Sequence, residues 1–300
     1  MPVVSANGIE LCYDEVGDKD APAIVLIMGL GTQMIAWSEP FCRALAGEGF
    51  RVVRFDNRDV GLSTKIEGAP PVALGTALAS VMAGKPVEAP YRLEDMAADT
   101  IGLMDALGLR RAHLVGASMG GMIAQILAAE HADRVISLTS IMSSSGAPDL
   151  PPARPEAIAA LLAPRPETVD REQAIALGMK VYRVIGSPGF PTSDEDLHAR
   201  IGAAVDRSYY PAGVSRQFVA VLANGSRVER LKRITVPTLV IHGEDDPLVP
   251  VEAGKDTARH IAGAALKLVP GMGHDLAAGL TPILVPAIAA HCKAAKPAGG

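Results

Sequence analysis

The sequence predicts an α/β fold in which helices flank a mostly parallel central sheet and a helical cap is inserted late in the chain. Three observations support it. Short apolar runs alternate with segments of helical periodicity. The runs at 23–28 and 236–241 are largely apolar rather than alternating, as in strands buried on both faces. Between them the composition changes, because residues 148–166 contain six prolines.

Length and composition set the class of protein. The 300 residues suffice for one large core, or for a core with an inserted subdomain. The hydrophobic content of 49% and charged content of 20% are typical of a globular enzyme. A net charge of −5 argues against nucleic acid or an anionic membrane as partner, since both favour basic surfaces. We expect a small-molecule substrate, and the composition is compatible with a homodimer.

The sequence shows no sign of export or metal binding. Residues 1–8 lack the basic and apolar regions of a signal peptide. The longest early apolar run, 23–30, is too short to span a bilayer. Cys12, Cys42 and Cys292 are widely spaced and odd in number, unlike a disulfide framework or a zinc site. We expect a cytoplasmic protein in which these cysteines are small buried side chains, with no metal and no cofactor.

The first half of the chain predicts a hairpin and then alternating strands and helices. Residues 3–13 form two strands around the turn Asn7-Gly8, whose residues tolerate a positive φ. Residues 64–90 are irregular around one short helix, and a segment this long usually covers or binds something. We expect further strands at 23–28, 51–55, 112–115 and 135–140, and helices at 39–47, 74–82, 93–107 and 122–129.

The second half predicts the cap and the return to the core. The serine-rich segment 143–146 leads out of the core, and alternation of strand and helix resumes after residue 232. We therefore expect a core domain of residues 1–142 and 233–300 and a cap of residues 143–232. Cap helices are expected at 172–185, 193–205 and 214–222, followed by strands at 236–241 and 266–269 and a helix at 276–294 that is broken or delayed near its two prolines. Ligands bind at the carboxyl ends of such strands.

A Gly-x-Ser-x-Gly motif places a serine at one of these strand ends. Gly116, Ser118 and Gly120 lie between the apolar run 112–115 and the helical run 122–129. A sharp strand-to-helix turn, which we call the elbow, raises the serine hydroxyl above the sheet, and glycines let backbones approach closely. The following helix directs its free N–H groups at the reaction centre. The motif predicts that Ser118 is a nucleophile.

A serine nucleophile needs a base, and His274 is the best placed of seven histidines. It follows the last strand across the flexible segment 270–273. His242 ends the preceding strand and is the competing candidate, with a packed strand-end histidine as its alternative interpretation. His113 begins the elbow strand, at the end far from Ser118.

The base needs an orienting carboxylate. Glu244, Asp245 and Asp246 follow the strand at 236–241, although three consecutive acids also suit a solvated loop. The chain order Ser…Asp…His matches the order of one class of serine hydrolases. At this point the residues alone leave the choice among the three acids open.

The elbow, the acidic loop and Gly-Met-Gly-His at 271–274 together resemble the α/β-hydrolase superfamily, over residues 9–292. Residues 27–29 and 54–63 are similar to the esterase branch that includes aclacinomycin methylesterase. The resemblance implies the α/β-hydrolase fold and a triad of Ser118, His274 and Asp246, with Asp245 as the alternative acid. It also suggests that Arg58 and Asp59 brace a turn.

An oxyanion hole requires two N–H donors. One is expected from the backbone of Met119, the residue after the nucleophile. The resemblance assigns the second to the backbone of Leu30. Many relatives have His-Gly in this loop, whereas this chain has Met28-Gly29. Because the donor belongs to the backbone, the change of side chain need not remove it.

The resemblance implies a serine carboxylic-ester hydrolase that acts on small to medium apolar esters through an acyl-enzyme. Competing enzyme classes are a carbon–carbon bond hydrolase, a lactonase, an aminopeptidase and a perhydrolase, and a non-catalytic ligand-binding protein with the same fold is the candidate from outside the enzymes. No arginine clearly demands, by its sequence position, a carboxylate-bearing substrate. Methionines near strand ends are expected to line the pocket or to pack in the core: Met28, Met34, Met119, Met122, Met142 and Met272.

Overall fold

The computed structural model describes residues 1–68 and 74–295. In this part of the chain, eight strands form one sheet in the order β1-β2-β4-β3-β5-β6-β7-β8. The pairs β1/β2 and β2/β4 are antiparallel and the remaining pairs are parallel. The strands are β1 (Val3–Ala6), β2 (Ile9–Val16), β3 (Ala23–Ile27), β4 (Arg51–Phe55), β5 (Ala112–Ala117), β6 (Val135–Ile141), β7 (Thr238–Gly243) and β8 (Ala265–Val269). The predicted α/β class is confirmed.

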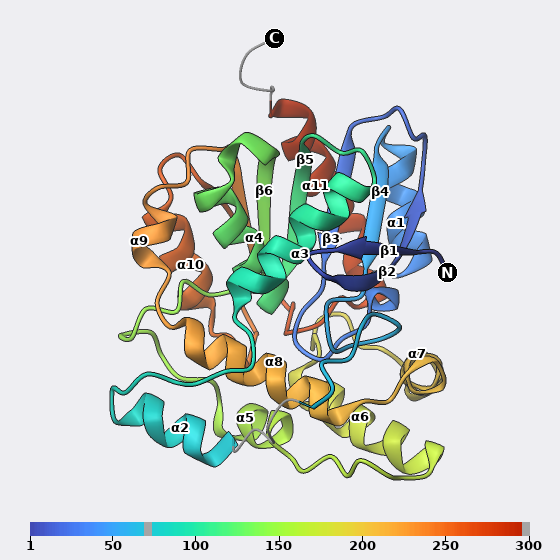
Figure 1. Cartoon of the computed structure of the whole chain (residues 1–300), viewed down its shortest axis with the longest axis vertical. Coiled ribbons are helices and arrows are strands. Elements are labelled where there is room, and N and C mark those ends of the chain that lie inside the picture. The colour runs from blue at the N-terminus through green and yellow to red at the C-terminus, as the bar shows by residue number, and fades with distance from the viewer. Residues whose placement is uncertain (69–73, 296–300) are drawn as a thin grey trace.

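Helices cover both faces of this sheet (Figure 1). Both faces of the sheet need covering because both are apolar. In strand β3, for example, successive side chains point alternately into two apolar cores, one on each face. Val25 and Ile27 pack with residues of α3 (Leu93–Ala106) and α4 (Met119–Glu130). Ile24 and Leu26 pack with residues of α1 (Glu39–Gly47) and α11 (Thr281–Ala294). A strand buried on both faces explains the continuous apolar run seen in the sequence.

A separate layer of helices lies at the carboxyl ends of the parallel strands (Figure 1). It comes from the chain between β6 and β7, and it has a small apolar cluster of its own around Ile175, Leu197 and Ile201. Helix α2 (Leu74–Met82), from the first half of the chain, packs beside α8 of this layer. The helices between β6 and β7 are α5 (Pro155–Leu161), α6 (Arg171–Ile185), α7 (Asp194–Arg207), α8 (Pro211–Asn224) and α9 (Val228–Leu231). We call α5–α9 the cap.

Some elements differ from the sequence prediction. The patterns do not predict the short helices α5 and α9, nor α10 (Val251–His260). Helix α5 can start at Pro155 in the proline-rich segment. In the first turn of a helix the backbone N–H has no acceptor within the helix, so proline, which lacks this N–H, is tolerated there. Helix α11 starts late, as expected, with Pro282 in its first turn, and it then continues through Pro286. Residues 69–73 of the expected irregular segment 64–90 lie outside the described residues.

The three cysteines are buried and unpaired, as the sequence predicts. Burial raises the pKa of Cys42 to about 11 and the pKa of Cys292 to about 12. Both therefore remain protonated thiols near neutral pH, where a thiol packs as a small apolar group. Among the described helices, none is long and apolar enough to cross a membrane.

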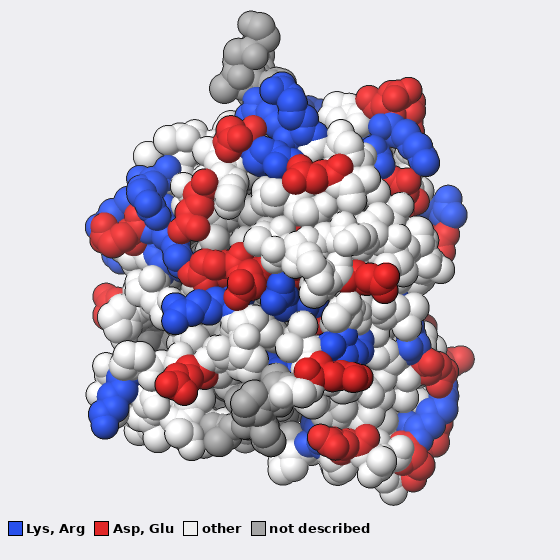
Figure 2. Space-filling view, viewed as in Figure 1, with Lys and Arg blue, Asp and Glu red and all other residues white. Residues whose placement is uncertain are grey.

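Charged side chains of both signs lie beside one another on the visible face in Figure 2. Surface ion pairs account for part of this mixing: Arg230 of α9 contacts Glu94 of α3 at 2.6 Å and Glu130 of α4 at 2.8 Å. These pairs join α9, the last helix of the cap, to α3 and α4 of the core. Because they are partly exposed, each contributes only modestly to stability.

Two buried ion pairs connect the cap to the loop after β4. Arg207 at the end of α7 lies 2.6 Å from Asp56, and Arg216 of α8 binds both carboxylate oxygens of Asp59 at 2.8 Å. Neither carboxylate is exposed. The neighbouring Arg58 pairs with Asp99 of α3 at 2.6 Å. Arg58 and Asp59 thus have the structural role that the sequence suggests.

The charge of Asp59 depends on its partners. Burial alone would raise the pKa of this carboxyl, but hydrogen bonds from Arg216 and from the Ile66 N–H hold the pKa below its usual value. An acid whose pKa is lower in the folded protein stabilises the fold above its unfolded pKa of about 3.9. That contribution is lost as the pH falls through the folded pKa.

We expect Arg216→Met to lower the free energy of unfolding by about 3–5 kcal/mol near pH 7, because Asp59 is left buried without a counter-charge. The loss should shrink as the pH is lowered from 7 toward about 4, because burial raises the pKa of the unpaired carboxyl and it takes up a proton within this range. Urea unfolding of both proteins across this range measures it. Arg43→Gln, which breaks an exposed pair, should change stability by less than about 0.5 kcal/mol. A pH-independent difference would contradict the interpretation.

Candidate active site

Ser118 lies between β5 and α4 in a strained backbone conformation. Its φ of 54° and ψ of −119° are rare for a residue with a side chain, and such strain is maintained only by surrounding structure. Here its N–H donates to the Ile141 carbonyl at 2.9 Å, and its own carbonyl accepts from Ser143 Oγ at 2.8 Å. Both partners belong to β6 or the residues after it, so the neighbouring strand holds the turn in place.

The glycines around Ser118 allow three backbone segments to meet. A Cβ on Gly116 would lie 2.2 Å from the Gly120 carbonyl oxygen, and one on Gly120 would lie 2.0 Å from the Ile27 carbonyl oxygen. A Cβ on Gly29 would lie 3.1 Å from the Ser118 Cβ, so the loop after β3 passes directly beside the serine. The expected reason for these glycines, close backbone approach, agrees with the structure.

The structure brings Ser118, His274 and Asp246 together. His274 Nε2 lies 2.9 Å from Ser118 Oγ, and His274 Nδ1 lies 2.7 Å from Asp246 Oδ2. A carboxylate only accepts hydrogen bonds, so Nδ1 carries the hydrogen and Nε2 can accept the serine proton. The other oxygen of Asp246 accepts the N–H groups of Leu248 and Val249 at 2.9 and 2.8 Å, which fixes the carboxylate.

The two competing residues make other contacts. Asp245 accepts the Gly271 N–H at 2.8 Å and so holds the loop that carries His274, rather than the imidazole itself. His242 is fully buried, its Nε2 lies 2.8 Å from the Val249 carbonyl, and burial lowers its pKa. Its ring packs against Gly254 of α10. Geometry therefore favours Asp246 and His274 over Asp245 and His242.

The loop after β3, which contains Leu30, passes beside Ser118 at Gly29. Gln217 of the cap helix α8 accepts the Gly31 N–H at 2.8 Å and donates to the Arg58 carbonyl at 2.8 Å. Asn57 donates to the Met28 carbonyl at 2.9 Å, which braces the start of the same loop. Within residues 1–68 and 74–295, the N–H groups of Leu30 and Met119 have no acceptor. The expected role as oxyanion donors requires that these two N–H groups have no acceptor within the protein.

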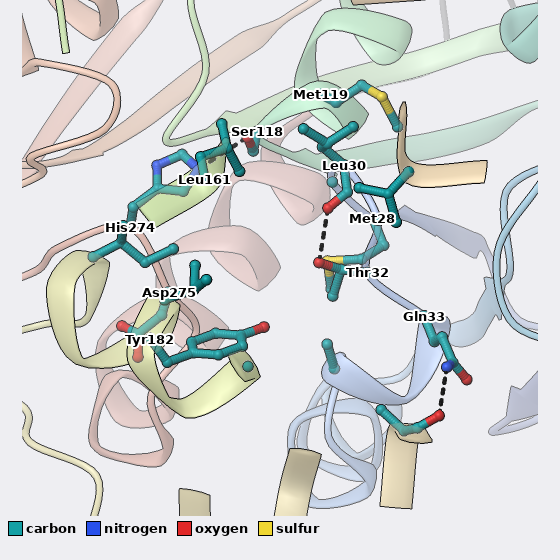
Figure 3. A pocket seen from close by; sticks show the side chains of 18 of the residues that line it. Met28, Leu30, Thr32, Gln33, Ser118, Met119, Leu161, Tyr182, His274 and Asp275 are labelled. Atoms are coloured by element: carbon teal, nitrogen blue, oxygen red, sulfur yellow. Dashed lines mark hydrogen bonds between the residues drawn. The ribbon is translucent and has the colours of Figure 1, made fainter. Parts of the chain in front are cut away.

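A cavity of about 430 Å³ opens between the core and the cap (Figure 3). Ser118 and His274 lie on its wall together with mainly apolar side chains from α5–α8. Four of the six methionines expected near the pocket line it: Met28, Met119, Met122 and Met142. The other two, Met34 and Met272, are fully buried and not among the lining residues, so for them core packing is the correct interpretation.

Sequence reasoning missed the polar groups that the cap contributes. Gln217, Arg207 and Arg216 connect the cap to the loops after β3 and β4. Arg165 and Arg200 line the cavity. In the sequence these residues lie in helices or in a proline-rich segment, without the strand-end position that identified the core residues. Only the folded cap brings them to the site.

We expect Gly120→Ala to destabilise the protein by about 1–3 kcal/mol, because the added methyl group overlaps the Ile27 backbone, which cannot move aside as a flexible side chain can. Gly47→Ala is the matched control, since a Cβ there meets nothing within 4 Å and alanine favours the helix. Urea unfolding compares the two. Equal stability for both variants would show that the elbow tolerates a Cβ.

Comparisons with known proteins agree with this fold. The alpha/beta hydrolase fold family matches residues 22–277. Rhodomycin D methylesterase of Streptomyces sp. (strain C5) is 27% identical and the alignment covers 98% of each chain. The 3-oxoadipate enol-lactonase 1 of Acinetobacter baylyi is 28% identical, with 86% of this chain and 84% of that protein covered. The crystal structure of the enol-lactonase from Burkholderia xenovorans LB400 has a TM-score of 0.74 at 26% identity, covering 97% of this chain and 100% of that one. The chain therefore belongs to the alpha/beta hydrolase fold family.

Proposed function

We propose that this protein is a serine carboxylic-ester hydrolase that works through an acyl-enzyme. The observation that carries the proposal is the continuous hydrogen-bonded chain Ser118–His274–Asp246 on the wall of a largely apolar cavity. Each contact is within the range needed for proton transfer between a nucleophile and its base. Membership of a hydrolase-fold family supports the reaction class.

In the first step, His274 Nε2 takes the hydroxyl proton of Ser118 as Oγ attacks the ester carbonyl carbon. Asp246 keeps Nδ1 protonated and stabilises the imidazolium that forms. The negative charge that develops on the carbonyl oxygen is accepted by the N–H groups of Leu30 and Met119. Fixed donors of this kind typically lower the barrier by roughly 2.7–4 kcal/mol each.

In the second step, the tetrahedral intermediate collapses and His274 gives its proton to the departing alcohol oxygen. The acid part of the substrate remains bound to Ser118 Oγ as an ester. His274 then takes a proton from water, which attacks the acyl carbon. Collapse of this second intermediate releases the carboxylic acid and returns the proton to Ser118. Every proton moves between groups of this chain, substrate and water.

The cavity and the relatives support a proposal for the substrate class. Its wall is apolar near Ser118, with Met28, Met119 and Met142 close to the nucleophile, which suits the apolar part of a small to medium ester. The methylesterase relatives, aligned over nearly their whole length, favour an ester of methanol. In such a substrate the acid part is the larger one, and it fills the cavity.

A lactonase is the second candidate, favoured by curated relatives that are enol-lactonases. Opening a lactone uses the same attack by Ser118, and the leaving oxygen stays attached to the product. A carbon–carbon bond hydrolase, an aminopeptidase or a perhydrolase would also use an activated serine. A non-catalytic binding protein would keep the cavity but would not turn over any of these substrates.

We expect Ser118→Ala to lower kcat for para-nitrophenyl acetate and for methyl esters by about 10³-fold or more, because the covalent intermediate can no longer form. The wild-type protein, but not this variant, should also be labelled by a fluorophosphonate, as intact-protein mass spectrometry would detect. A folded variant that retained full ester hydrolysis would rule out the mechanism. Absence of both turnover and labelling in the wild-type protein would favour a non-catalytic binding protein.

The two neighbouring aspartates offer a matched comparison. Asp246→Asn should lower kcat by about 10⁴-fold, since the amide no longer fixes the productive tautomer of His274. Asp245→Asn should lower kcat by less than about 10-fold, because Asp245 contacts only the backbone of the histidine's loop. Steady-state kinetics on para-nitrophenyl acetate measures both. The opposite ranking would assign the orienting role to Asp245.

A further inference from the structure

The cap end of the cavity carries positive charge that the proposed reaction does not use. Of the described residues that line the cavity, Arg165, Arg200, His274 and Asp275 have side chains of the types that carry charge near neutral pH. Nearly all other lining side chains are apolar or aromatic. Two guanidinium groups among apolar side chains are unexpected, because removing a charge from water costs free energy unless the charge is paired.

Arg200, on α7, is held against the cavity by an aromatic ring. Its guanidinium carbon lies 4.4 Å from the ring centroid of Tyr182 on α6. Stacking orients the group but uses none of its N–H donors. Its Nη2 is buried and, within the described residues, has no hydrogen-bond acceptor. No described carboxylate forms an ion pair with it, although many other arginines in the structure have such a pair.

Arg165 lies on the same side of the cavity, in the segment between α5 and α6. It is half-buried, and burial lowers its pKa, although an arginine remains charged near neutral pH. Tyr209 and Tyr182 are the ionisable groups that interact with it electrostatically. Tyr209 donates to the Pro166 carbonyl at 2.9 Å, which fixes the chain beside Arg165. The described residues supply Arg165 with neither an ion pair nor a hydrogen bond.

Asp275 does not cancel these charges. It is the one described carboxylate on the cavity wall, and it accepts a hydrogen bond from Ser187 Oγ at 2.5 Å. Burial raises its pKa, against the opposing effects of Ser187 and Arg200. It forms no ion pair with either arginine. Even with Asp275 ionised, the two arginines leave this part of the cavity positive.

The arginines lie apart from the nucleophile. In Figure 3 the Tyr182 ring extends into the cavity below His274 and Asp275, and Ser118 and Leu30 lie above it. Arg200 stacks on this ring, so its guanidinium is on the Tyr182 side. A substrate with its ester carbonyl at Ser118 and its acid part extending into the cap would bring its far end toward the arginines.

We propose that Arg165 and Arg200 form a subsite for a carboxylate on the acid part of the ester. The proposal rests on the proposed ester hydrolysis. It narrows the substrate class to monoesters of dicarboxylic acids, in which the second carboxylate is free. Hydrolysis then releases methanol and a dicarboxylate. The unpartnered Nη2 of Arg200 and the unpaired guanidinium of Arg165 donate to the carboxylate, and the apolar wall between the two ends holds the connecting chain.

The kinetic test uses pairs of methyl esters of equal size. One member of each pair is the monomethyl ester of a dicarboxylic acid, from glutaric to suberic acid, and the other has an isopropyl group in place of the free carboxylate. At the best chain length, kcat/KM of the wild-type protein should favour the charged ester by about 10-fold or more. The ratio should decrease with added salt as the charges are screened.

Substitutions of the two arginines test whether they cause the preference for the charged ester. Arg200→Gln and Arg165→Gln should each reduce the charged-to-neutral ratio by about 10-fold, and Arg200→Lys should retain part of it because a cation remains. Arg233→Gln is the control, since Arg233 is an exposed surface arginine and the ratio should not change. Melting temperatures establish that each variant is folded. A ratio near one in the wild-type protein at every length, or a preference unchanged in both glutamine variants, overturns the subsite.

A binding measurement separates this proposal from the proposed function. Calorimetry on the Ser118→Ala protein should show monomethyl adipate binding about 10-fold or more tightly than its neutral partner, and adding Arg200→Gln should remove the difference. Ester hydrolysis without charge preference would leave the function standing and overturn the subsite. Tight charge-dependent binding to a protein that hydrolyses no ester would retain the subsite and overturn the function.

Discussion

Two buried carboxylates after β4 set the relation between the core and the cap. Asp56 and Asp59 are fully buried, and a buried charge is tolerated only with a partner. The cap supplies that partner in both cases, through Arg207 and Arg216. Asp56 also accepts the Met34 N–H at 2.8 Å, so the same carboxylate holds the end of the loop that contains Leu30. Because Gln217 of α8 fixes the middle of that loop, the cap orders the backbone around Leu30, one of the two expected oxyanion donors.

Strain at Ser118 is maintained in a similar way, by parts of the chain that are distant in sequence. Ser118 keeps its positive φ because β6 binds its N–H and the segment after β6 binds its carbonyl. The glycines at 116 and 120 then let α4 and the loop after β3 approach the turn. The hydroxyl is therefore aimed at His274 by backbone contacts. A conformation that costs on the order of 1–3 kcal/mol is held by the sheet before substrate arrives.

What the sequence could predict follows from how local each signal is. The buried strand at 23–27, the elbow at Ser118 and the strand-end positions of Asp246 and His274 are each recognisable within a dozen residues, and the parallel sheet brings such strand ends to one edge. The choice of Asp246 over Asp245 came from resemblance, and only the hydrogen bonds explain it physically: one aspartate contacts the imidazole and the other a backbone N–H. The sequence does not place Arg165 and Arg200 at the cavity, or Gln217 at the loop after β3. These residues reach their positions only when the cap packs on the core, and no local sequence pattern indicates that packing.

The uneven distribution of charge in the cavity gives the proposed substrate a direction. Near Ser118 the wall is formed by methionines, leucine and backbone, where an ester meets N–H donors but no fixed positive charge. At the cap end, two guanidinium groups lie beside Tyr182 without a carboxylate of their own. A molecule with one anionic end and one ester end therefore has a single favourable orientation, with the ester at the serine. The product acid would carry a second negative charge at Ser118, where the wall is apolar, so the arrangement that orients the proposed substrate also disfavours retention of the product.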